Sequence, residues 1–183
     1  MKRKIAAFLL AICLAGSLAA CGKGPAKAEP DENGNYVVNG GFEAADFTGW
    51  TVTNIDDVTE ELDVYTRETD CLEGVQSLHF YSGSHEVNFT AEQTISGLEK
   101  GTYKLTGSAQ GESAGDEEPA VVFYAVIGGE KVTANAALQG YVNWSTAELG
   151  GLAVENGEIT IGISVHTAPG GWGTIDSVSL VKE

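Results

Sequence analysis

From Tyr36 onward, hydrophobic and polar residues alternate in short runs that are separated by clusters of Gly, Asn, Asp and Ser. A repeat of two residues is typical of a β-strand with one buried face, and no stretch has the 3.6-residue period of a long amphipathic helix. The predicted strands are 49–54, 77–82, 87–95, 101–110, 120–127, 131–138, 158–166 and 174–181. Eight or more short strands predict an all-β fold, an antiparallel β-sandwich.

The alternation also predicts which side chains face the core. In 158–166 the odd positions from 159 to 165 are Ile or Val, and we expect them to point inward. In 120–127 both rows are apolar, so that either both faces of this strand are buried or Tyr124 lies in a groove. Trp50, early in an alternating strand, is expected to fill the core.

The first twenty residues form a separate segment. Basic residues at 2–4 precede the apolar run 5–18, which has no charged residue and is too short to cross a bilayer as a helix. The string Leu18-Ala19-Ala20-Cys21 resembles the lipobox of bacterial lipoproteins. The resemblance implies cleavage before Cys21 and a lipid on its thiol, so that the chain is exported and anchored at the bacterial cell membrane, facing outward. The alternative is an ordinary secretory signal with an incidental cysteine.

These patterns divide the chain into three parts. Residues 1–20 are a lipoprotein signal peptide, 21–35 are the lipidated cysteine with a flexible linker, and 36–183 are the sandwich domain. The linker has no large apolar residue. Removal of Cys13 with the signal and lipidation of Cys21 leave Cys71 without an intrachain partner. We expect Cys71 to be a small buried hydrophobe and not a catalytic thiol.

Charge excludes one class of partner. The sequence has 26 acidic and 10 basic residues and a formal net charge of −16. A nucleic-acid surface needs clustered Lys and Arg, so we predict no nucleic-acid partner.

Short motifs near both ends of the domain carry a resemblance to a known superfamily. The strings Asn-Gly-Gly-Phe-Glu at 39–43, Gly-Trp-Thr-Val at 49–52 and Gly-Trp-Gly-Thr-Ile-Asp at 171–176 resemble the jelly-roll carbohydrate-binding modules of the galactose-binding-like superfamily. More narrowly, 77–81, 142–144 and 171–176 are similar to the galactan-binding modules of bacterial endo-β-1,4-galactanases. The resemblance covers 36–183 and implies a jelly roll that binds β-1,4-galactan or a related plant polysaccharide.

The same resemblance implies a structural calcium ion. In that superfamily, acids equivalent to Glu43 and Asp176 ligate the ion together, and carboxylate and carbonyl oxygens are the ligands that calcium prefers. The alternative is that Glu43 and Asp176 are two solvated acids near strand ends.

A sugar-binding site combines flat aromatic rings, which stack on the C–H face of the sugar, with planar polar groups that bind its hydroxyls. Trp144 and Trp172 lie in Gly- and Asn-rich contexts where a ring is readily exposed, although each is equally suited to closing the core. The further candidates carry a ring or a planar polar group: Asn143, Gln110, Tyr124, Tyr81, Tyr141, His79 and His166.

No catalytic motif occurs in the sequence. It contains no Walker loop, His-Glu-x-x-His or Cys-x-x-Cys string. A glycosidase would need two carboxyl groups about 5 to 9.5 Å apart across a cleft, a geometry that no sequence pattern reveals. We therefore predict a monomeric non-enzyme that binds a polysaccharide at the cell surface. The alternative is a structural or adhesive β-sandwich with buried tryptophans that binds a protein partner.

Overall fold

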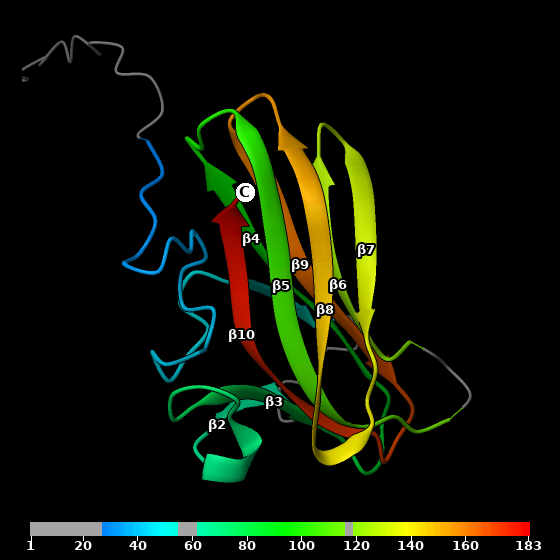
Figure 1. Cartoon of the computed structure of the whole chain (residues 1–183). Coiled ribbons are helices and arrows are strands. Elements are labelled where there is room, and N and C mark those ends of the chain that lie inside the picture. Colours follow the sequence, from blue (N-terminus) through cyan, green and yellow to red (C-terminus); the bar gives the residue numbers. More distant parts are fainter. Residues whose placement is uncertain (1–26, 55–61, 116–118) are drawn as a thin grey trace, which may run out of the picture.

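The computed structural model describes residues 27–54, 62–115 and 119–183, and the predicted signal peptide and Cys21 lie outside these ranges. Within the described ranges, ten strands form two five-stranded sheets that pack face to face (Figure 1). Every pair of neighbouring strands is antiparallel. The predicted all-β antiparallel sandwich is confirmed.

Sheet 1 has the strand order β1-β4-β9-β6-β7. Its strands are β1 (Thr51–Asn54), β4 (Val87–Ser96), β9 (Glu158–Thr167), β6 (Val121–Ile127) and β7 (Glu130–Ala136). Sheet 2 has the order β2-β3-β10-β5-β8. Its strands are β2 (Leu62–Tyr65), β3 (Ser77–Tyr81), β10 (Trp172–Lys182), β5 (Gly101–Glu112) and β8 (Gly140–Val154).

A short 3-10 helix, η2 (Glu68–Asp70), lies between β2 and β3 at the lower end of sheet 2 in Figure 1. No helix in the described part of the chain is long and apolar enough to cross a membrane.

The core lies between the two inner faces, as the alternation predicts. The odd positions of β9 from Ile159 to Val165 are completely buried, and so are Leu78 and Phe80 on β3. Gly107 interrupts the apolar row of β5 because a Cβ there would lie 2.1 Å from the ring of Phe123. Gly107 therefore leaves room between the two sheets for the ring of Phe123.

Trp50 belongs to the core, as expected. It is buried, its ring is stacked on that of Phe42 at 5.7 Å, and its Nε1–H donates to the Asn39 carbonyl oxygen at 3.1 Å. Trp50 thus closes one end of the sandwich and is not available to a ligand.

The chain contacts the sandwich before the predicted linker boundary at residue 35. Ala28 N–H donates to the Gly97 carbonyl oxygen at 2.9 Å, and Asn35 forms an isolated β-bridge with Val181. Within the predicted linker, Ala28 and Asn35 therefore contact the sandwich, whereas residues 29–33 are exposed. Since the hydrophobic cluster is made by residues between Ala28 and Leu180, a chain that begins at Gly22 keeps all of the core.

Candidate functional site

A cavity of about 210 Å³ lies on the outer face of sheet 2, where β3 and β10 pair. The face is the outer one because Leu78 and Phe80 point into the core, so that His79 and Tyr81 point the other way. Eight residues from β2, η2, β3, β8, β10 and the residue that precedes η2 surround the cavity: Tyr65, Arg67, Asp70, His79, Tyr81, Tyr141, Trp172 and Thr174.

Aromatic rings form one side of the cavity. Trp172 is half-buried and lies opposite Tyr81 in the register of β10 and β3. The ring of Tyr141 lies 6.1 Å from that of Trp172, tilted by 52°. Tyr81 and Tyr141 are 49% and 52% exposed. These three residues offer apolar surface to which a ligand has direct access.

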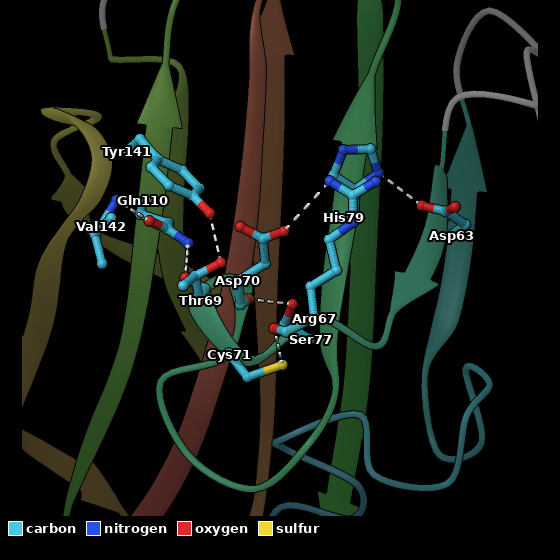
Figure 2. A network of polar contacts seen from close by, with 10 residues as sticks. All are labelled: Asp63, Arg67, Thr69, Asp70, Cys71, Ser77, His79, Gln110, Tyr141 and Val142. Carbon is cyan, nitrogen blue, oxygen red and sulfur yellow. Dashed lines mark hydrogen bonds and ion pairs between the residues drawn. The ribbon is translucent and has the colours of Figure 1, made fainter.

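Polar groups complete the lining of the cavity. Asp70 is 4% exposed, and the Arg67 guanidinium is its ion-pair partner at 4.0 Å. His79 is stacked on Tyr65 at 3.6 Å, and its Nδ1 bonds the Asp63 carboxylate at 2.7 Å (Figure 2). Because a carboxylate only accepts, it holds a proton on Nδ1, which leaves Nε2 of the neutral ring as an acceptor.

The hydroxyl of Thr174 is a further polar group at the cavity. Thr174 is buried and lines the cavity, and its Oγ1 has no hydrogen-bond partner among the described residues. Buried polar atoms are nearly always paired with protein, water or a ligand. The cavity therefore presents aromatic faces, a buried carboxylate and an unpaired hydroxyl, a combination suited to a neutral ligand rich in hydroxyl groups.

Gln110, on β5, holds the two walls of the cavity together. The side chain is completely buried, its Nε2 donates to the Thr69 carbonyl oxygen at 3.0 Å, and its Oε1 accepts from Val142 N–H at 2.5 Å (Figure 2). Tyr141 adds a bridge on the same side, since its hydroxyl lies 2.5 Å from Thr69 Oγ1. Gln110 thus joins η2 to the start of β8, and both polar atoms of its side chain are taken up by these two hydrogen bonds.

Strain supports this role for Gln110. Val142 has a φ of 61°, in the left-handed region that β-branched residues rarely adopt. The hydrogen bond from Val142 N–H to Gln110 holds the backbone there, and the adjacent Tyr141 thereby reaches Thr69. Both polar atoms of the Gln110 side chain, which was predicted as a sugar ligand, are thus bonded to the backbone of Thr69 and Val142.

The structure brings several predicted site residues together, namely Trp172, Tyr81, His79, Gln110 and Tyr141. Trp144 is half-buried on β8 and, by the alternation of that strand, shares the outer face with Thr146, but it is not among the residues that line the cavity. Neither Trp144 nor Trp172 belongs to the buried core. Asn143 is exposed, and its amide donates to the Gln139 carbonyl oxygen at 3.1 Å.

Tyr124 and His166 lie on sheet 1, away from the cavity. Tyr124 is 1% exposed, packs over Gly162, and donates its hydroxyl to Glu92 at 2.6 Å, while Lys131 Nζ lies 3.5 Å from its ring centroid. Burial and the Glu92 carboxylate raise the pKa of Tyr124. Tyr124 is therefore buried on the outer row of β6, between the half-buried Val122 and Val126, and is not in a groove. His166, on β9, lies 3.5 Å from Glu86.

Because Tyr124 lies on sheet 1 and the cavity lies on sheet 2, its replacement gives a testable prediction. Tyr124→Phe should lower the free energy of unfolding by about 1 to 2 kcal/mol, because a hydrogen bond to a charged acceptor is lost from a buried site. It should leave the affinity for any ligand of the sheet 2 cavity unchanged. Chemical denaturation and a binding assay on the same variant check both parts, and a loss of affinity would locate the ligand on sheet 1.

The predicted calcium ligands lie near each other beside a second, larger cavity. Asp176 is completely buried, and its Oδ2 accepts from Leu72 N–H at 2.7 Å and from Glu73 N–H at 3.0 Å. Burial raises the pKa of Asp176 in spite of these bonds, and the nearby Glu43 charge raises it further. Glu43 Oε1 accepts from Val75 N–H and Gln76 N–H at 2.8 and 2.9 Å.

These surroundings fit a hard cation. Ser177 Oγ and Gln76 Oε1 are buried without a hydrogen-bond partner in the described part of the chain. Ser177 follows Asp176 in the sequence, and Gln76 donates its backbone N–H to Glu43. Those ranges contain no group of three or more His, Cys, Asp or Glu placed to hold a metal, so the remaining ligands would be neutral oxygens. Calcium accepts such mixed oxygen ligands.

Cys71 is a free thiol, and it is half-buried where we expected full burial. Its Sγ–H donates to the Arg67 carbonyl oxygen at 3.1 Å, and burial raises the pKa of the thiol. Cys71 lies in the chain segment between the aromatic cavity and the Glu43–Asp176 cluster.

Sequence reasoning missed the residues that come from β2 and η2, Tyr65, Arg67 and Asp70, because the segment was assigned to no element. It also missed Thr174. The available signal for Thr174 was its place between Trp172 and Asp176 in an alternating row, which puts all three on one face.

Comparison with solved structures identifies similar folds. A family 61 carbohydrate-binding module in complex with β-1,4-galactotriose is 25% identical, with a TM-score of 0.72, over 81% of this chain and 99% of that one. A family 16 carbohydrate-binding module is 12% identical, with a TM-score of 0.55, over 80% of this chain and 99% of that one.

A third similar structure is part of a larger enzyme. The family 22 and catalytic modules of Clostridium thermocellum xylanase 10B, complexed with xylohexaose, are 16% identical with a TM-score of 0.51. The match covers 80% of this chain and 28% of that one. At the two lower identities the likeness concerns the fold alone. No protein-family model and no curated protein matches the chain. The jelly-roll fold of carbohydrate-binding modules is thus established for this chain.

Proposed function

We propose that this chain is a non-catalytic carbohydrate-binding module that binds β-1,4-galactan, exported and held at the cell surface as a lipoprotein. The observation that carries the proposal is the cavity on sheet 2, which sets accessible rings of Trp172, Tyr81 and Tyr141 against the buried Asp70 carboxylate and the unpaired Thr174 hydroxyl. The similarity to a module solved with β-1,4-galactotriose supports the choice of sugar.

The chemistry of galactose suits these groups. Its axial 4-hydroxyl leaves a continuous C–H face on the other side of the ring, and such a face stacks on Trp or Tyr. Carboxylates accept strong hydrogen bonds from neighbouring hydroxyls, and a buried one gains more from them than an exposed one. Asp70 and the Trp172 side of the cavity therefore supply the two halves of sugar recognition.

Affinity electrophoresis tests the proposal. A chain that begins at Gly22 should be retarded in gels that contain pectic galactan, and retarded less in gels that contain xylan or glucan. Galactotriose added to the gel should restore its mobility. Unchanged mobility across the whole panel of plant glycans would overturn the proposed function.

The lipid anchor is a second part of the proposal, and it rests on the sequence. A binding module gains local concentration from a tether, because a captured polysaccharide stays near the membrane. The chain should be recovered from the membrane fraction of the producing bacterium, and Cys21→Ser should release it. Equal membrane association of both proteins would contradict lipidation at Cys21.

Calcium at Glu43 and Asp176 is the third part, and it gives a prediction about stability. An ion that binds only the folded state at 100 times its Kd adds about 2.7 kcal/mol, which raises Tm by about 5 to 10 °C in a domain of this size. We expect this shift between EDTA and millimolar calcium in thermal melts, and we expect Glu43→Gln to reduce it. Identical melting curves with and without chelator would exclude the ion.

A further inference from the structure

The segment 66–76, which we call the strap, connects β2 to β3 and contributes to both sites. Towards the aromatic cavity it supplies Arg67 and Asp70, and Thr69 is bound there by Gln110. At its other end the strap meets the two acids of the calcium cluster. One short stretch of chain therefore connects the cavity wall to the acid cluster.

Four backbone N–H groups fasten this second end. Leu72 and Glu73 donate to Asp176, and Val75 and Gln76 donate to Glu43, at 2.7 to 3.0 Å. Hydrogen bonds that end on a carboxylate are stronger than bonds between neutral groups. Each of the two acids thus accepts hydrogen bonds from two consecutive backbone amides of the strap.

Apolar packing does not replace these bonds. Leu72 and Val75 are 42% and 60% exposed, and Glu73 and Gly74 are exposed as well. A segment with few buried apolar contacts opens readily unless polar bonds hold it. Between the two anchored ends, Asp70 N–H and the Cys71 thiol both donate to the Arg67 carbonyl oxygen, and Ser77 Oγ donates to that of Asp70 at 2.5 Å. This short turn transmits the position of residue 72 to Asp70.

Gly74 shows how closely the strap approaches Glu43. Its φ is 66°, and a Cβ at this position would lie 2.1 Å from Glu43 Oε1. Only glycine lets the carboxylate come this near the backbone. The contact between Glu43 and the strap therefore requires glycine at position 74.

We infer that Glu43 and Asp176 are positioning residues for the glycan cavity, because they hold the strap and thereby fix Arg67 and Asp70 in the cavity wall. This inference rests on the proposed function of the cavity. It does not require a bound ion, since the four hydrogen bonds are made by the protein itself.

Glu43 gives the cleaner test of the two acids. It is exposed, whereas Asp176 is completely buried and its replacement endangers folding. Glu43→Ala removes two of the four bonds. Gly74→Ala keeps the carboxylate but displaces it, so it disturbs the same contact in a different way. Glu130→Ala removes an exposed carboxylate from sheet 1 and serves as the matched control.

The experiment uses Cys71 as a reporter, because it is the only cysteine in a chain that begins at Gly22. In buffer with EDTA, the rate of thiol labelling by a maleimide is measured together with the affinity for galactotriose by titration calorimetry. We expect Glu43→Ala and Gly74→Ala to label at least about 10-fold faster and to bind at least about 10-fold more weakly. Glu130→Ala should match the unmodified chain in both assays.

The two readouts separate the possible failures. Unchanged labelling in both variants would overturn the inference, and so would faster labelling with undiminished affinity, since the cavity would then not depend on the strap. If the unmodified chain binds no galactotriose either in EDTA or in millimolar calcium, the proposed sugar is wrong. Faster labelling of the variants would then still support the positioning of the cavity wall, and unchanged labelling would still overturn it.

Discussion

Trp172→Ala is expected to weaken galactan binding by about 10- to 100-fold, which corresponds to about 1.4 to 2.8 kcal/mol. Trp172 lines the cavity on sheet 2 and is flanked there by Tyr81 and Tyr141. Its removal takes away the largest ring available for stacking on a sugar. Titration with galactotriose and affinity electrophoresis in galactan measure the loss.

The domain should remain folded in this variant, because Trp172 is only half-buried and lies outside the core cluster. Trp144→Ala is the matched control, since it removes the same side chain from a half-buried site that does not line the cavity. Its affinity should stay within about 3-fold of the original. An equal loss in both variants would mean that the ligand extends over β8, and loss of the thermal transition with Trp172→Ala would make that residue structural.

The fold was largely predictable because one buried face per strand leaves a strong pattern of period two. The row from Ile159 to Val165 is an example, and all of its inward positions are completely buried. The sequence did not predict β8, although this is a long strand of 15 residues. Its pairing with β5 shifts register twice, near Leu105 and near Gly111, and each shift breaks the alternation from which strands are recognised.

The candidate site was predictable only in part. Alternation within 77–82 already puts His79 and Tyr81 on the outer face. Trp172 lies on the neighbouring strand, but it precedes the predicted strand 174–181, and only its Gly-rich context indicated exposure. Asp70 is beyond such reasoning, because a turn between strands has no periodic signal. Tyr124 was misplaced for another reason. A tyrosine on an outward row looks accessible in sequence, and only the fold shows that Gly162 leaves room for its ring to lie flat on sheet 1.

Gln110 is predictable in one respect and not in the other. Alternation gives its position on β5, but only the structure shows which groups its side chain bonds. Gln110→Met keeps the length of the side chain and leaves the Thr69 carbonyl and Val142 N–H without their partner. An unpaired buried polar group costs about 1 to 3 kcal/mol. We expect a lower free energy of unfolding by about 2 kcal/mol and a loss of more than about 10-fold in galactan affinity.

Gln110→Glu separates the two bonds. The carboxylate still accepts from Val142 N–H, but it sets an anionic oxygen against the Thr69 carbonyl oxygen in a fully buried site. Burial raises the pKa of such a carboxyl group, and the protonated form regains an O–H donor for Thr69. Galactan affinity of this variant should therefore be low at about pH 8 and should recover as the pH falls to about 5, while that of Gln110→Met should not recover. A Gln110→Glu variant with full affinity at about pH 8 would show that the bond to Thr69 does not hold the cavity wall.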